Sequence, residues 1–293
     1  IWVGSDDGLV HLTRDGGDSW NNITPLQAPK FLMINSIETS FFKSGEAYIA
    51  GTSYKMGDFK PYLFKTNDYG KTWKKIVNGI KPEHFTRVLR SDPARKGLLY
   101  AGTESGLYVS YDDGESWSSF QKNLPIVPIT DLTIKDNSLI VATQGRGIWI
   151  LDDLTVLHQI NDSTVNNQIN LFAPKDSYRM RGSGGKSSKT AGTNIENGVI
   201  VYYNIKNYDS SKDSISLSFS TSEGNLIKTF SNHDKVNILK VNKGSNKFVW
   251  DTKHDGAEIL DGMIFWSASF SGAKSPPGEY LVTLIKNGVK KSQ

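Results

Sequence analysis

The 293-residue chain contains no cysteine, so disulfide bonds, thiol catalysis and cysteine-ligated zinc or iron–sulfur sites are excluded. No apolar run approaches the roughly 18 residues that a membrane-spanning helix needs. The five histidines, at positions 11, 84, 158, 233 and 254, lack the spacing of metal ligands. We therefore predict a protein without a cofactor, a metal ion or a transmembrane segment.

A strong charge of either sign is also absent. The 34 Lys and Arg residues and the 30 Asp and Glu residues leave a net charge of +4, and the two signs are interspersed. This distribution lacks the basic patch of a nucleic-acid-binding protein. An initiator methionine and a signal peptide are missing, because the chain begins Ile1-Trp2-Val3-Gly4, which already has the pattern of a strand. We expect the chain to be a fragment, or the ordered part, of a longer protein.

The chain does contain a motif of eight residues that occurs three times. Each copy has a hydroxyl residue first, aspartate third, glycine fifth, a second hydroxyl residue seventh and tryptophan last. The copies are box 1 (Thr13–Trp20), box 2 (Thr66–Trp73) and box 3 (Ser110–Trp117). Three matches at five fixed positions indicate a repeated architecture.

The residues of a box have the properties of a tight hairpin turn. The aspartate can accept hydrogen bonds from backbone N–H groups about two residues on, and the glycine can adopt a positive φ where the chain reverses. The tryptophan then begins the next strand and is expected to bury its ring. The predicted structural residues are Asp15, Gly17 and Trp20 in box 1, Asp68, Gly70 and Trp73 in box 2, and Asp112, Gly114 and Trp117 in box 3. Because the three aspartates fall in successive hairpins, we predict no catalytic role for them.

The spacing of the boxes predicts a β-propeller. Trp20 and Trp73 are 53 residues apart, and Trp73 and Trp117 are 44 residues apart. A period of about 40–50 residues built of short strands is typical of propeller blades. Residues 1–174 hold too few strands to close a ring, even if Ile169–Ala173 supplies the outer strand of the last blade. We therefore predict that they are the C-terminal blades of a propeller, whose partners are upstream blades of the same polypeptide.

The second half of the chain differs in composition. Residues 175–198 are rich in Gly, Ser, Lys and Thr and are predicted to form a linker. Residues 199–293 alternate apolar and polar residues over about seven short strands, which is typical of an Ig-like or fibronectin-like β-sandwich. One of these strands is predicted at Gly262–Ser269. The whole chain is thus predicted to be all-β.

The boxes match the Asp-box of the BNR repeat, which occurs in sialidases, in the sortilin (VPS10) propeller and in two-propeller xyloglucanases. Two further segments, Leu99–Ser110 and Gln144–Asp153, make the resemblance more specific. They resemble exported bacterial proteins that carry a sortilin-like Asp-box propeller followed by a small β-sandwich and that are often labelled glycosyl hydrolases. The resemblance implies export and this two-part fold. It supplies no catalytic residue, because the Arg-Ile-Pro segment typical of sialidases is absent.

Candidate binding residues lie in the first half, on a long loop, by residue type, or in both ways. The second repeat is longer than the third because of an insertion near Ser53–Lys60, and long loops on a rigid ring commonly carry binding. We select Tyr54 and Phe59 from this insertion as candidate ligand-binding residues. Arg87 and Arg146 are added by residue type, because a sialidase-like site needs arginines. Arg90 is of the same type, and for all three arginines hydrogen bonding at the surface or between blades is the favoured alternative.

Three functions remain open at this point. The first is an exported or cell-surface binding protein or scaffold, non-catalytic in this segment, with a protein or glycan partner. The second is a glycoside hydrolase acting on polysaccharides, with catalytic acids partly on missing blades; it needs two inner-face carboxylates about 5–10 Å apart. The third is a receptor that binds peptides or proteins in the manner of sortilin.

Overall fold

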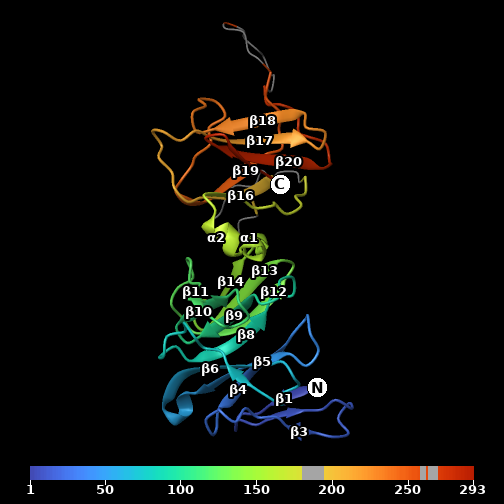
Figure 1. The fold of residues 1–293 in the computed structure, drawn as a ribbon, viewed down its shortest axis with the longest axis vertical. Helices are drawn as coiled ribbons and strands as arrows, with labels where there is room; N and C mark the ends of the chain where they lie inside the picture. Colours follow the sequence, from blue (N-terminus) through green and yellow to red (C-terminus); the bar gives the residue numbers. More distant parts are fainter. Residues whose placement is uncertain (180–194, 258–261, 263–269) are drawn as a thin grey trace. The chain divides into compact units, whose positions relative to one another are not determined.

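The computed structural model describes residues 1–179, 195–257, 262 and 270–293. The chain divides into two compact units, Ile1–Leu154 and Thr155–Gln293. Both units consist mainly of antiparallel strands (Figure 1), which confirms the all-β prediction. Within the described part of the chain, no helix has the length and hydropathy of a membrane span.

The first unit contains four sheets, which we call blades 1 to 4. Blade 1 consists of β1 (Trp2–Gly4), β2 (Val10–Leu12) and β3 (Asn21–Asn22). Blade 2 consists of β4 (Met33–Thr39), β5 (Ala47–Ser53), β6 (Asp58–Thr66) and β7 (Lys74–Lys75), with the 3₁₀ turn η1 (Tyr54–Met56) between β5 and β6. Blade 3 consists of β8 (Thr86–Ser91), β9 (Leu99–Thr103), β10 (Gly106–Ser110) and β11 (Ser118–Ser119). Blade 4 consists of β12 (Ile129–Lys135), β13 (Ser138–Thr143) and β14 (Ile148–Leu151).

Each blade is an antiparallel meander, which confirms the prediction of a propeller-type fold. Because successive strands of a meander alternate in direction, the hairpins after the first and third strands lie at one end of a blade. The hairpin after the second strand and the connection to the next blade lie at the other end. All three boxes join the third strand of a blade to its fourth, so they share one end. By this count blade 1 lacks an inner first strand, and blade 4 lacks an outer fourth strand among the described residues.

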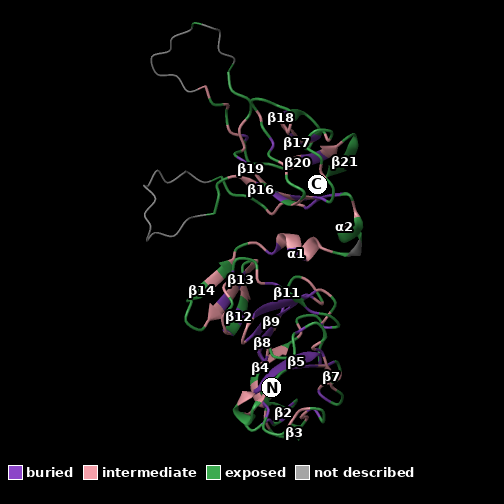
Figure 2. Ribbon diagram, turned by 90° about the vertical axis from the view of Figure 1, so that its left-hand side faces the viewer, coloured by how far each residue is buried: buried purple, intermediate pink, exposed green. Residues whose placement is uncertain are grey.

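The blades are held together by apolar side chains between neighbouring sheets. Strands β5 and β9 (Figure 2) are buried along their whole length, and so is β10. The core between blades 2 and 3 includes Tyr48 and Leu63 from one side and Leu99, Tyr108 and Trp117 from the other. Burial on both faces explains why these strands are almost continuously apolar.

The second unit begins with two short helices, α1 (Thr155–Gln159) and α2 (Asp162–Asn166). One sheet has the order β15-β16-β19 and the other β18-β17-β20-β21. The strands are β15 (Ile169–Leu171), β16 (Val199–Ile205), β17 (Ile215–Thr221), β18 (Leu226–Ser231), β19 (Gly244–Trp250), β20 (Tyr280–Lys286) and β21 (Val289–Ser292). Both sheets contribute to one core, in which the rings of Phe219 and Trp250 stack with centroids 4.3 Å apart. The Ig-like assignment of this unit stays a prediction.

The observed division of the chain differs from the predicted boundary at residue 174. Ile169–Ala173 does not complete the last blade, because β15 pairs with β16 and belongs to the second unit. The side chains of Ile169 and Leu171 lie in the core of that unit. Of the predicted linker 175–198, residues 180–194 lie outside the described residues, as does all of the predicted strand 262–269 except Gly262.

Candidate functional site

Each box is closed by the same set of hydrogen bonds. In box 2, Thr72 donates its backbone N–H to Oδ1 of Asp68 (2.9 Å) and its hydroxyl to Oδ2 (2.6 Å). Thr66 donates its hydroxyl to Oδ1 of Asp68 (2.8 Å) and accepts the backbone N–H of Gly70 (2.9 Å). Boxes 1 and 3 repeat this pattern. The principal backbone donor therefore lies four residues after the aspartate, further along than the predicted two.

These bonds keep the three box carboxylates ionised. Hydrogen bonds from Ser19 hold the pKa of Asp15 far below its usual range, and hydrogen bonds from Thr72 lower the pKa of Asp68. Burial acts to raise the pKa of Asp112, but hydrogen bonds from Ser116 outweigh this effect, and the pKa is lowered. A fully ionised acid that is hydrogen-bonded within its own turn is poorly suited to donate a proton in catalysis. No group of three or more acids and histidines in the described ranges is arranged to hold a metal ion.

The tryptophan of a box reaches the preceding blade. Trp117 donates its indole N–H to the backbone carbonyl of Ile76 (2.8 Å), and Trp73 donates to the carbonyl of Ile23 (2.6 Å). Ile76 and Ile23 each follow directly after the outer strand of the preceding blade. The box is thus also a joint between two blades.

The box glycine lies against the same isoleucine. A Cβ atom on Gly114 would lie 2.7 Å from Cδ1 of Ile76, and one on Gly70 would lie 2.6 Å from Cδ1 of Ile23. A Cβ atom on Gly17 would meet nothing within 4 Å. Glycine therefore serves two purposes in boxes 2 and 3, a positive φ and close approach of the neighbouring blade, but only the first in box 1.

The burial predicted for the box tryptophans holds in full only for Trp117, which is 4 % exposed. Trp73 is half-buried, and Trp20 is 45 % exposed. The prediction for Trp20 is wrong, because a ring is buried only where a neighbouring blade covers it. Among the described residues, no backbone carbonyl accepts the indole N–H of Trp20 in the way that Ile23 and Ile76 accept those of Trp73 and Trp117.

A second cluster lies at the opposite end of the blades. The rings of Tyr54 and Phe85 stack with centroids 5.3 Å apart, and the ring of Phe59 lies 6.1 Å from that of Phe85. The guanidinium of Arg87 lies 5.4 Å from the Phe85 ring centroid. Its Nε and Nη2 atoms both lie 2.7 Å from Oε2 of Glu104, which fixes the orientation of the guanidinium. Phe85 is itself buried, 6 % exposed, and supports the other three side chains. We call Tyr54, Phe59, Phe85 and Arg87 the aromatic surface.

The insertion that carries this surface is anchored. Gly57 ends η1 in the left-handed conformation, with φ 74°. The hydroxyl of Tyr62 donates to Oδ2 of Asp58 (2.5 Å), and burial together with this bond raises the pKa of Tyr62 to about 12. Met56 and Phe59 nevertheless remain 61 % and 54 % exposed. An open cavity of about 580 Å³ lies between Gly57–Lys60 and Pro82–Glu83.

Three of the four candidate binding residues therefore come together, and Arg146 does not join them. Arg146 is exposed in the hairpin between β13 and β14, where its carbonyl accepts the indole N–H of Trp149 (3.0 Å). No ring contact or ion pair among the described residues links Arg146 to the aromatic surface. Phe85 and Glu104, which orient the cluster, were missed because they come from other loops than the insertion.

A third cluster links the inner strands of three blades through Arg90, in the inter-blade role expected for this arginine; its partners on the other blades were missed. Arg90 donates to Oδ1 of Asp131 on β12 (2.8 Å), and its Nη1 lies 3.8 Å from a carboxylate oxygen of Glu38 on β4. Arg90 also donates to the hydroxyl of Ser36 (2.6 Å) and to the carbonyl of Leu132 (2.8 Å). Burial raises the pKa of Glu38, against the opposing effects of a backbone N–H and of Arg90. The arrangement locks strands β4, β8 and β12 together.

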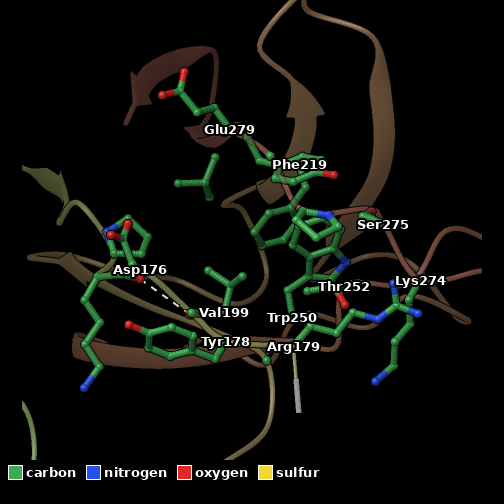
Figure 3. Close-up of a pocket in the computed structure, with 18 of the residues that line it drawn as sticks. Asp176, Tyr178, Arg179, Val199, Phe219, Trp250, Thr252, Lys274, Ser275 and Glu279 are labelled. Atoms are coloured by element: carbon green, nitrogen blue, oxygen red, sulfur yellow. Dashed lines mark hydrogen bonds between the residues drawn. The ribbon is translucent and has the colours of Figure 1, made fainter. Parts of the chain in front are cut away.

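The second unit contains a cavity of about 760 Å³ (Figure 3). Its lining includes Tyr178, Arg179 and Lys274 at the rim and Phe219 and Trp250 on the wall. The two wall rings are each only 1 % exposed, so they offer no open face for a ligand to stack on. None of the candidate residues lies in this cavity.

Comparison with curated proteins finds no match. Among solved structures, YCF48 bound to D1 peptide is 21 % identical with a TM-score of 0.40, over 52 % of this chain and 47 % of that one. The GH74 xyloglucanase from Xanthomonas campestris is 18 % identical with a TM-score of 0.40, over 51 % and 25 % of the two chains. The Niastella koreensis GH74 enzyme is 14 % identical with a TM-score of 0.42, over 70 % and 33 %. The chain thus spans about half of YCF48 and a third or less of these enzymes, and similarities this low do not inform on activity.

A family model supplies the assignment. The Sortilin-Vps10 model, described as sortilin, neurotensin receptor 3, matches residues 8–166, which is more than half of the chain. The matched segment contains all three boxes, the aromatic surface and the Arg90 cluster. The chain therefore belongs to the Sortilin-Vps10 family.

Proposed function

We propose that the chain is a non-catalytic binding unit of an exported or cell-surface protein and that the aromatic surface contacts a protein partner. The observation that carries this proposal is an anchored loop with Met56 and Phe59 both more than half exposed. Aromatic, methionine and arginine side chains are enriched in protein interfaces, and the oriented Arg87 lies against Phe85, the ring that Phe59 also contacts.

Two further features support a binding role. The aromatic surface combines η1 and the start of β6 from blade 2 with Phe85 and Arg87, before and at the start of β8, from blade 3, so the packed sheets hold its side chains in place. The chain belongs to a family whose description names a receptor, neurotensin receptor 3, and this favours a protein ligand over a glycan. Export is proposed from the resemblance of the boxes alone.

The test compares two exposed phenylalanines at opposite ends of blade 2. Phe59 is 54 % exposed on the proposed contact, and Phe41, in the hairpin between β4 and β5, is 62 % exposed at the box end. A photo-crosslinking residue at position 59 identifies the partner in a surface extract, and calorimetry with the purified partner then measures affinity. Phe59→Ala should weaken binding about tenfold or more, whereas Phe41→Ala should not. Equal effects of the two substitutions would refute the assignment, and a glycan in place of a protein would correct the partner class.

A polysaccharide hydrolase is the second candidate, because the Arg90 cluster brings two inner-strand carboxylates, Glu38 and Asp131, around one guanidinium. The raised pKa of Glu38 is the property that a general acid needs. Arg90 counts against this role, because a fixed cation favours the ionised carboxylates. Turnover of any glycan by the intact protein, abolished by Glu38→Gln, would establish the hydrolase and refute the non-catalytic proposal.

We also propose that further blades of the same polypeptide complete the propeller. Trp20 and Val3 are 45 % and 46 % exposed on blade 1, whereas in blades 2 and 3 the corresponding tryptophan is hydrogen-bonded to a neighbouring blade, half-buried in Trp73 and buried in Trp117. An added blade ending in an isoleucine-like residue would give Trp20 the hydrogen bond that Trp73 and Trp117 make. The intact polypeptide should therefore be much larger than 32.5 kDa, and a native mass near that value would refute the proposal.

A further inference from the structure

The cavity of about 760 Å³ in the second unit lies where three segments of that unit meet. They are residues 173–179, which follow β15, residues 197–199, which lead into β16, and residues 274–280, which lead into β20. Phe219 on β17 and Trp250 on β19 form the wall behind them. The volume lies within the range of about 300–1,000 Å³ that is usual for small-molecule sites, so the cavity has room for a ligand.

The wall formed by residues 274–280 is fixed to the rest of the unit. Ser275 donates its backbone N–H to the carbonyl of Thr252 (2.7 Å). The hydroxyl of Tyr280 donates to the carbonyl of Pro276, which closes the turn between them. These bonds are made without any ligand, so this side of the cavity is already formed in the free chain.

Charges of opposite sign lie on different sides of the cavity. In Figure 3 the side chains of Arg179 and Lys274 lie on the right of the view, and those of Asp176 and Glu279 lie on the left, with the two wall rings between them. Ionised carboxylates accept hydrogen bonds and donate none, whereas arginine and lysine only donate. A ligand that fits this lining therefore offers an anion to one side and hydrogen-bond donors to the other.

Arg179 and Lys274 have no carboxylate partner among the described residues. Lysines elsewhere in the same unit do pair with carboxylates; they are Lys212, Lys228, Lys247, Lys253 and Lys286. Two like charges on one rim repel each other, and an anion bound at that rim lowers the repulsion. The arginine fork in addition matches the geometry of a carboxylate. The rim is therefore suited to bind a carboxylate.

Tyr178 supplies an exposed aromatic face at the same rim. Its side chain is 82 % exposed, and it directly precedes Arg179. The face of an aromatic ring is apolar and carries partial negative charge, so it packs well against the C–H groups of a sugar ring. The rings of Phe219 and Trp250 cannot serve this purpose, because both are buried.

A uronic acid combines the three properties that the lining requires. It is a sugar that carries a carboxylate, and the same ring also offers several hydroxyl donors and a face of C–H groups. An acidic peptide offers the carboxylate, but it has neither the sugar hydroxyls nor the ring face. The lining therefore favours an acidic saccharide over an acidic peptide.

We propose that this cavity binds an acidic oligosaccharide built of uronic acids. Arg179 and Lys274 bind the carboxylate of a sugar ring, and Tyr178 packs against a ring face. Asp176 and Glu279 accept hydrogen bonds from hydroxyl groups. The site lies wholly in the second unit and does not depend on the proposed role of the aromatic surface.

Calorimetry of the full chain tests the ligand class with three probes. They are the trimer of galacturonic acid, the methyl ester of the same trimer and a peptide of three glutamates. The trimer should bind, and its ester should bind about tenfold or more weakly, because it has the same sugar rings without the charge. Triglutamate should also bind about tenfold or more weakly, because it leaves the acceptors on the other side of the cavity without hydroxyl donors.

Substitutions at the rim test the assigned residues. Arg179→Met and Lys274→Met each remove a charge and keep an unbranched side chain, and each should weaken binding of the trimer about tenfold. Tyr178→Ala should weaken it about fivefold through the lost ring contact. Lys243→Met is the matched control and should leave binding unchanged, because Lys243 is an exposed lysine of the same unit outside the cavity. Thermal unfolding of each variant checks that the second unit stays folded.

Three results would overturn the proposal. The first is the absence of binding at about 1 mM, both for this trimer and for the trimer of mannuronic acid. The second is equal affinity for the trimer and its methyl ester. The third is an equal effect of Arg179→Met and Lys243→Met. Tighter binding of triglutamate than of either trimer would show that the cavity takes a peptide, and the assigned ligand class would then be wrong.

Discussion

Box 1 and box 3 are the same eight-residue turn in different surroundings. Asp15 and Asp112 make the same hydrogen bonds within their own hairpins. Trp20 is 45 % exposed, whereas Trp117 is 4 % exposed and bonded to the carbonyl of Ile76. The comparison separates two roles of a box. Its aspartate closes the hairpin without help from a neighbouring blade. Its tryptophan is buried and hydrogen-bonded only where a preceding blade is present.

The largest expected difference is between the two tryptophans. Trp117→Ala should lower the free energy of unfolding of the first unit by about 3–5 kcal/mol, because it empties a buried site and removes a hydrogen bond. Trp20→Ala should change it by less than about 0.5 kcal/mol, as for most surface substitutions. Calorimetry, which can resolve the two units, measures both. Equal losses would show that box 1 is also engaged and would break the comparison.

The glycines should give a smaller but parallel difference. Gly114→Ala combines a φ of 87° with a Cβ atom 2.7 Å from Ile76, so we expect a loss of about 2–4 kcal/mol. Gly17→Ala meets no neighbouring atom within 4 Å and should cost only the backbone strain, about 1–2 kcal/mol. Denaturant titration of the two variants measures the difference, and it would be contradicted if Gly17→Ala cost as much as Gly114→Ala.

The aspartates should behave alike in all boxes, because their bonds are local. Asp112→Ala should cost about 1–2 kcal/mol, as for the loss of other side-chain caps. Asp112→Asn should cost less, since its amide oxygen still accepts one of the bonds. A loss of ligand binding or of any enzymatic activity in Asp112→Asn, with the unfolding transition unchanged, would contradict a purely structural role.

Acid should weaken the turns through the same carboxylates. The pKa values of Asp15 and Asp68 are lowered in the folded chain, chiefly by side-chain hydrogen bonds from Ser19 and Thr72. A lowered folded pKa contributes stability above the unfolded value of about 3.9, and this stability is lost as the pH falls through the folded value. Urea midpoints measured from pH 6 downwards should therefore fall below about pH 4. The fall should be shallower when the three box aspartates are replaced by asparagine.

The sequence allowed the turns and the fold class to be predicted, because both depend on local chemistry. One hairpin requires Thr66 and Gly70 at fixed positions, so their spacing can be recognised in the sequence. The position of β15 could not be predicted, because Ile169 and Leu171 suit the outer strand of a blade as well as the core of the next unit. Only pairing with β16 decides between them.

The candidate binding residues were found in part for a similar reason. The insertion that carries Tyr54 and Phe59 is visible as extra length in one repeat. Phe85 and Glu104, which orient the cluster, and Arg90, which joins three inner strands, are brought into place by register between blades. That register depends on contacts between distant residues, which no local pattern records.

The central claim is that every box forms its hairpin turn by itself. A box joins two blades only where another blade precedes its own. Exchange of the indole N–H protons, followed by nuclear magnetic resonance of a ¹⁵N-labelled chain, tests it in one sample. The indole protons of Trp73 and Trp117 should exchange slowly, because they are donated to Ile23 and Ile76, and that of Trp20 should exchange quickly. Protection of Trp20 equal to that of Trp117 would contradict the account.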